Sequence, residues 1–262
     1  MTKRIISALI GAPLLLIVTW LGGWYLSILV VILALLGLRE FLYIGRKAGF
    51  IIRQWPMVVF CTIWLIVFVS GLKEWLLPLG VVWLMLTLGS YALRYPNVSL
   101  EKVAYSFLAL IYPVFMFTFL ESLRGLPDGL YWCFFVFAMV WLTDTGAFFV
   151  GITLGKHKLV PKVSPNKSVE GAIGGLAMAL ISGLAFWLIT DIGSLPGILV
   201  LSLLTSMVSQ IGDLFESALK RTAGVKDSGK LIPGHGGILD RFDSFLFALP
   251  LVYYAIQLGI VY

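Results

Sequence analysis

Long apolar runs without charge dominate the chain, and polar residues gather between them. A helix needs about 20 mostly apolar residues to cross a membrane, with about 17 as the lower limit. Charge-free runs of that size occur at 54–72, 75–93, 103–120, 171–190, 192–212 and 244–262. The run 129–155 is interrupted only by Asp144, and the run 5–38 is too long for one helix, so we divide it at Gly22-Gly23. The pattern predicts nine membrane-spanning helices.

Composition supports a membrane protein. Of the 262 residues, 60% are hydrophobic and only 12% are charged, and the mean hydropathy is +1.00. Soluble domains average about 25% charged residues, and one soluble core cannot hide so much apolar surface. We therefore predict an all-α, polytopic integral membrane protein with one membrane domain, residues 1–262. The apolar stretch after Lys3-Arg4 lacks a small-residue cleavage site, so we interpret it as a first span and not as a signal peptide.

The distribution of positive charge predicts the orientation. With nine spans, all but two of the 19 Lys and Arg residues fall on one side, and only Lys73 and Arg124 fall on the other. Positive loops face the cytoplasm, so we expect a cytoplasmic N-terminus, with Tyr262 at the C-terminus outside. We attribute the net charge of +6 to this topology, and we expect no nucleic-acid partner.

The two halves of the chain differ in character. Residues 1–128 have short loops and no acidic cluster, which is typical of a scaffold. Residues 129–262 contain the intramembrane acids and two long cytoplasmic loops. We expect the active site in this second half.

Carboxylates at membrane depth are costly and usually face a cavity, a partner or a metal. Asp144 in the sixth span either belongs to a site or pairs with a cation from a basic loop or with a neighbouring helix. In the eighth span a polar stripe follows steps of three and four along one helical face. Its members are Ser202, Thr205, Ser206, Ser209, Asp213, Glu216, Ser217 and Lys220. The stripe indicates a cavity wall. Polar contact between helices is the alternative, which Ser202 and Thr205 fit and Asp213 with Glu216 fits badly.

Small residues recur at four-residue intervals in the seventh span. They are Gly171, Gly175, Ala179 and Gly183. Such a ridge allows close helix packing, and we assign it to structure. The sequence leaves the partner helix open.

The last cytoplasmic loop, 220–243, combines cations with carboxylates. Its cations are Lys220, Arg221, Lys226 and Lys230. Asp240 and Asp243 are three residues apart, which places both on one helical face. Carboxylate oxygens suit Mg²⁺, which is often shared with substrate phosphates. The loop predicts a Mg²⁺-dependent phosphoryl or nucleotidyl transfer site at the cytoplasmic membrane face.

Two further features of the cytoplasmic loops bear on phosphate binding. Backbone N–H groups of the glycine-rich segment 233–237 are suited to an anion-binding nest. Its His235 either hydrogen-bonds a phosphate or protonates a leaving group, since its ordinary pKa lies near neutrality. The basic loop 152–170 either adds cations to the site or binds anionic lipid.

Residues 217–243 resemble the signature of the phosphatidate cytidylyltransferase, or CDP-diacylglycerol synthase, family. The match begins at Ser217-Ala-Leu-Lys220-Arg221 and runs through Lys226-Asp227 to the segment Pro233-Gly-His235-Gly236-Gly237-Ile-Leu-Asp240-Arg241-Phe-Asp243. The segments 143–148 and 155–171 are also similar to the family. Members of this family are polytopic enzymes that make CDP-diacylglycerol and pyrophosphate from CTP and phosphatidate.

The resemblance also implies roles for individual residues. It makes Asp213 and Asp240 the Mg²⁺ ligands and places Lys226, Asp227 and Asp243 in the active site, where we add Asp144 as a catalytic candidate. The candidate substrate-binding residues are Ser217, Lys220, Arg221, His235, Gly236, Gly237 and Arg241. A potassium-like monovalent ion, a homodimer and a bacterial inner-membrane location with the active site facing the cytoplasm are implied as well.

Two other functions compete with this one. A CTP-dependent enzyme that acts on another lipid acceptor would share the same motifs. An ion-coupled transporter would also place acids and small residues in broken helices. It would not need cations and carboxylates concentrated in one cytoplasmic loop, and we find no repeat symmetry.

Overall fold

The computed structural model describes residues 2–50, 54–232, 234 and 236–262. The first half contains α1 (Thr2–Leu21), α2 (Gly23–Lys47), α3 (Trp55–Val69), the short 3₁₀ helix η1 (Lys73–Trp75), α4 (Leu76–Arg94), α5 (Leu100–Leu110), the π-helical turn η2 (Ile111–Phe115) and α6 (Met116–Arg124). The second half contains α7 (Gly129–Leu154), the strands β1 (Lys158–Val160) and β2 (Ser164–Ser168), α8 (Val169–Thr190), α9 (Leu195–Thr222) and α10 (Leu239–Gln257).

The helices lie where the apolar runs predict them, and the all-α membrane class is confirmed. Among the described residues, six helical segments are long and apolar enough to cross a membrane: α2, η1 with α4, α5 through α6, α7, α8 and α9. The number nine and the orientation of the termini stay predictions. The expected division of the first run is confirmed, because α1 and α2 meet at Gly22 and Gly23, with φ of 63° and 51° that favour glycine.

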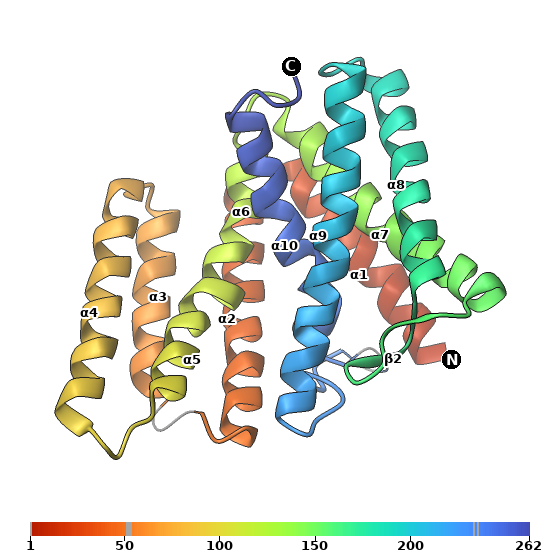
Figure 1. Cartoon of the computed structure of the whole chain (residues 1–262). Helices are drawn as coiled ribbons and strands as arrows, with labels where there is room; N and C mark the ends of the chain where they lie inside the picture. Colours follow the sequence, from red (N-terminus) through yellow and green to blue (C-terminus); the bar gives the residue numbers. More distant parts are fainter. Residues whose placement is uncertain (1, 51–53, 233, 235) are drawn as a thin grey trace.

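Two helices differ from the simplest interpretation of the pattern. α5, η2 and α6 form one continuous helical segment (Figure 1), and its π-helical turn contains Pro113. Proline lacks the N–H that an α-helix needs at that position, so the hydrogen-bond ladder is interrupted there. α9 continues beyond its apolar run to Thr222, with Lys220 and Arg221 in the last turn, where cations are favourable.

The ridge of small residues in α8 packs within the same chain. A Cβ on Gly175 would lie 3.1 Å from the carbonyl oxygen of Thr143 in α7. Gly183 faces Ser202 of α9 still more closely. α8 therefore packs against both α7 and α9, and this answers which helices the ridge contacts.

The basic loop between α7 and α8 is an ordered hairpin, which the sequence did not predict. β1 and β2 pair antiparallel, with Lys158 opposite Ser168. Glu170 at the start of α8 accepts hydrogen bonds from the backbone N–H groups of Lys156 and His157, and its Oε1 lies 2.6 Å from Nδ1 of His157. These contacts fix the hairpin to the end of the helix pair.

The core lies among α2, α6, α7 and α10, where large aromatic side chains are fully buried. They include Phe41, Phe117, Trp132, Phe135 and Phe137. α3 and α4 stand at one edge of the bundle (Figure 1), and only 6% of the most apolar window of η1 and α4 is buried within the protein. α9 packs against α10 beside this core, and the ends of these two helices carry polar residues.

Candidate active site

The N-terminal part of the polar stripe on α9 is buried between helices. Ser202, Thr205, Ser206 and Ser209 are at most 1% exposed. The hydroxyls of Ser202 and Thr205 donate to carbonyls of their own helix, and the Thr143 hydroxyl of α7 donates to that of Ser206 at 3.0 Å. The alternative of polar contact between helices therefore holds for Ser202 and Thr205, and the predicted cavity wall is wrong for Ser206 and Ser209, because all four hydroxyls have partners inside the bundle.

The polar stripe first becomes exposed at Asp213, whose side chain is 34% exposed. Its Oδ2 forms an ion pair at 2.6 Å with Nζ of Lys167, which β2 carries to the end of α9. The hydroxyl of Ser217, one turn further along, lies 3.4 Å from Oδ1. Arg221 donates from Nε to the carbonyl of Val163 at 3.2 Å. The hairpin is thus held against α9, which brings a cation to Asp213.

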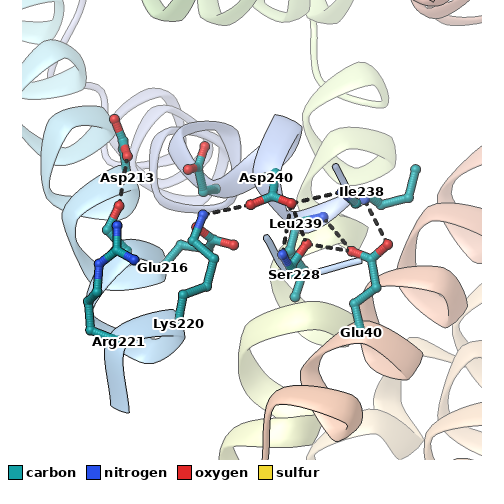
Figure 2. A network of polar contacts seen from close by, with 12 residues as sticks. Glu40, Asp213, Glu216, Lys220, Arg221, Ser228, Ile238, Leu239 and Asp240 are labelled. Atoms are coloured by element: carbon teal, nitrogen blue, oxygen red, sulfur yellow. Dashed lines mark hydrogen bonds and ion pairs between the residues drawn. The ribbon is translucent and has the colours of Figure 1, made fainter. Parts of the chain in front are cut away.

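Lys220 joins two carboxylates on different helices (Figure 2). Its Nζ forms ion pairs with Oε2 of Glu216, one turn earlier on α9, and with Oδ1 of Asp240 on α10, the latter at 2.6 Å. Glu216 is fully buried, and its Oε1 has no hydrogen-bond partner among the described residues. A buried carboxylate needs a counter-charge, and Lys220 supplies it.

Asp240 is held by the loop that precedes its own helix. Its Oδ2 accepts hydrogen bonds from the backbone N–H and the hydroxyl of Ser228, both at 2.9 Å, and from the N–H of Gly237 at 2.8 Å. Gly237 belongs to the predicted anion-binding nest, so this N–H already binds a carboxylate of the protein. Both oxygens of Asp240 are therefore oriented by named donors.

Glu40 of α2 is the residue that sequence reasoning missed. Its carboxylate is buried, with the residue 6% exposed. Oε1 accepts from the N–H of Ile238 at 2.9 Å, and Oε2 accepts from the N–H of Leu239 at 2.9 Å and from the hydroxyl of Ser228 at 3.0 Å (Figure 2). A negative charge at the start of a helix is favourable, so Glu40 fixes the beginning of α10.

The Ser228 hydroxyl lies within hydrogen-bonding distance of both Glu40 and Asp240. It has one proton to donate, so it bridges the two carboxylates and donates to one at a time. A side chain at Gly237 would collide with Glu40, which explains the glycine there. The only sequence signal for Glu40 is an isolated acid at the end of an apolar run.

Three helices bring further aspartates to the same region. Asp243 of α10 interacts electrostatically with Asp213 of α9 and Asp144 of α7. Asp144 in turn feels the charges of Lys167 and Arg241. These three aspartates, from helices far apart in sequence, are therefore close enough to influence one another, and their joint role in a site stays a prediction.

The other predicted site residues lie outside the ion pairs of Lys220 and Asp240. Lys226 and Asp227 are exposed on the loop after α9, and neither forms a hydrogen bond or ion pair with a described residue. Gly236, with φ of 84°, packs against the Asp240 carboxylate. Arg241 is exposed, and His235 lies outside the described residues. The structure therefore brings Glu216, Lys220 and Asp240 together, whereas Lys226 and Asp227 are exposed.

The carboxylates do not form a metal cluster of the usual protein-only kind. Within the described part of the chain, no group of three or more His, Cys, Asp or Glu residues is placed to hold a metal ion. Mg²⁺ often takes only one or two carboxylates and completes its shell with water and substrate phosphates. In the structure one oxygen of Asp213 and one oxygen of Asp240 each pair with a lysine ammonium, and their role as Mg²⁺ ligands stays a prediction.

Apolar helices that carry carboxylates and lysines together at one end define a membrane-embedded protein with a polar site suited to phosphate chemistry. Comparison with known sequences specifies the class, because the model of the cytidylyltransferase family matches residues 2–259. This chain belongs to that family.

Individual relatives match this chain along nearly its whole length. The chain is similar to the phosphatidate cytidylyltransferase of Staphylococcus saprophyticus, with 38% identity over 96% of this chain and 97% of the relative. It is also similar to the enzymes of the same name from Bacillus subtilis, with 36% identity over 98% of both chains, and Staphylococcus aureus, with 38% identity over 96% and 97%. The family resemblance found in residues 217–243 is confirmed.

Proposed function

We propose that this chain is a phosphatidate cytidylyltransferase that makes CDP-diacylglycerol and pyrophosphate from CTP and phosphatidate. An oxygen of the lipid phosphate attacks the α-phosphorus of CTP, a new P–O bond forms, and the bond to the pyrophosphate oxygen breaks. The observation that carries the proposal is the pair of charge clusters at the ends of α9 and α10, in which Lys220 pairs with Glu216 and Asp240 and Lys167 pairs with Asp213, within a chain that the family model matches over residues 2–259. The attacking oxygen is already anionic, so the reaction needs positioning and charge stabilisation more than a strong base.

The lysines of the network are the groups that we assign to phosphate charge. Lys167 and Lys220 are each held by carboxylates in the structure, so their positions are fixed before substrates bind. Preorganised cations stabilise developing charge without reorganisation during the reaction. Exposed Lys226 on the adjacent loop is placed to meet the soluble substrate, CTP, from the aqueous side.

Mg²⁺ is the cofactor that fits these residues. Asp213 and Asp240 would hold it. Once bound, Mg²⁺ would neutralise phosphate oxygens and polarise the transferring group. Asp240 is oriented for this by Ser228 and Gly237, and Asp213 is accessible from solvent. The family resemblance also implies a potassium-like ion and a homodimer, to which we assign no residue.

The charge distribution supports an active site that faces the cytoplasm. The site residues lie on the ends of α9 and α10 and on the two basic loops, which the topology assigns to the cytoplasmic side. CTP is supplied from that compartment, and the lipid tails would remain in the membrane. The proposed location is the inner membrane of a bacterial cell.

Pyrophosphate release by the purified protein in detergent tests the function. We expect release from CTP only when phosphatidate and Mg²⁺ are both present. Release with a polyprenyl phosphate but not with phosphatidate would favour another lipid acceptor. No release with either lipid, from protein shown to be folded, would contradict the proposal, and ion-driven uptake by vesicles without CTP would then support a transporter.

A further inference from the structure

A cleft between α3, α4 and α5 shares no lining residue with the candidate active site. Its volume is about 300 Å³, at the lower end of the range of about 300–1,000 Å³ that is typical of small-molecule sites. Trp83, Met57 and Val103 form apolar walls and are at most 7% exposed. Figure 1 shows these helices at one edge of the bundle, with α9 beyond α2 and α5. The cleft is therefore a separate feature of the first half of the chain.

Two cations line this apolar cleft. Arg94 is in the last turn of α4, and Lys102 is in the first turns of α5. Neither forms an ion pair with a described residue. Ser90, half-buried between them and the apolar wall, adds a hydroxyl. The cleft thus combines two positive charges that lack an acidic partner in the described structure with an aromatic wall.

The surface beside the cleft suits hydrocarbon. Leu86 lines the cleft and is 58% exposed, and Met85 and Leu93 of the same helix are 67% and 89% exposed. Apolar surface of this extent on a spanning helix faces lipid tails. A ligand that fills the cleft can therefore continue along α4 as hydrocarbon without meeting water.

We propose that this cleft binds an anionic phospholipid, with its phosphate at Arg94 and Lys102 and an acyl chain beside Trp83 and Leu86. Charge complementarity selects the headgroup, since a neutral or zwitterionic lipid brings no net negative charge to the two cations. The continuous apolar surface of α4 selects a lipid over a free nucleotide. Because α4 has little other packing, a lipid bound here also ties the α3–α4 hairpin to α5. The site does not depend on the proposed enzymatic function.

Native mass spectrometry of the full chain in detergent measures this binding. The probes are dioleoyl phosphatidylglycerol, which is not a substrate of the proposed reaction, and dioleoyl phosphatidylcholine, which has the same chains and a zwitterionic head. We expect the wild type to retain phosphatidylglycerol selectively. Arg94→Gln with Lys102→Gln should weaken phosphatidylglycerol binding about tenfold, which corresponds to about 1.4 kcal/mol, and leave phosphatidylcholine within twofold.

Two further variants separate a defined site from general surface charge. Arg46→Gln with Lys47→Gln removes the same charge from the end of α2 and should leave phosphatidylglycerol binding unchanged. Ser90→Trp fills the cleft while keeping both cations, and it should abolish selective retention. An equal loss in the Arg46/Lys47 variant, full binding by Ser90→Trp, or displacement of the lipid by CTP would overturn the proposal.

Discussion

Replacement of Glu40 tests whether the first half of the chain positions the active-site loop. Its carboxylate accepts three hydrogen bonds, from the N–H groups of Ile238 and Leu239 and from the Ser228 hydroxyl. In Glu40→Gln the amide oxygen can take the place of only one carboxylate oxygen. If it faces Leu239 and Ser228, the amide NH₂ faces the Ile238 N–H, and at least one buried backbone donor loses its acceptor.

The magnitude follows from that lost bond. An unsatisfied buried donor costs about 1–3 kcal/mol, which is a factor of roughly 5–150 in an equilibrium constant at 1.4 kcal/mol per tenfold. Amide hydrogen exchange at Ile238 reports the opening of this segment. We expect exchange to accelerate by that factor in Glu40→Gln, and by more in Glu40→Ala, which removes all three bonds.

Loosening of this loop in Glu40→Gln should also lower enzymatic activity. Asp240 shares the Ser228 hydroxyl with Glu40, so a loosened loop leaves Asp240 less often in its oriented position. We expect kcat for pyrophosphate release to drop while the thermal midpoint of Glu40→Gln changes little, because the core around α2 is intact. Glu74→Gln removes an exposed carboxylate and serves as the control. Wild-type exchange at Ile238 together with wild-type kcat in Glu40→Gln would refute a positioning role.

Three further predictions concern the proposed site and the packing of the bundle. Asp213→Asn and Asp240→Asn should each reduce turnover at least 100-fold, which corresponds to about 2.7 kcal/mol or more of lost transition-state stabilisation. Circular dichroism of both variants should remain normal. Normal turnover in either variant would remove that residue from the proposed metal site. Lys226→Ala should raise the KM for CTP more than that for phosphatidate, and steady-state kinetics showing equal changes would count against its assignment. Gly174→Ala should lower the thermal midpoint in detergent, because the added Cβ would collide with α7. Gly80→Ala is the control, since a Cβ there meets nothing within 4 Å. Equal midpoints for the two variants would contradict the close packing of α7 and α8.

The site illustrates how far residue patterns can reach. The spacing of Asp213, Glu216 and Lys220 places them on one helical face, and the structure confirms that all three lie on α9, with Lys220 ion-paired to Glu216. The same spacing argument extended the cavity wall to Ser206 and Ser209, where it failed. Periodicity identifies a face, whereas the neighbouring helix that covers the face determines whether water reaches it.

The positions of the helices, the break at Gly22-Gly23 and the family follow from the amino-acid sequence, because apolar length, glycine conformation and a fixed motif are local properties of the chain. The pairing of Lys167 with Asp213 and the packing of α8 against both α7 and α9 become visible only in the folded protein. The same is true of the contact between Glu40 and the start of α10, across almost 200 residues of sequence. Such contacts depend on how the helices pack in three dimensions, and one isolated acid at the end of an apolar run does not reveal which distant N–H groups it will meet.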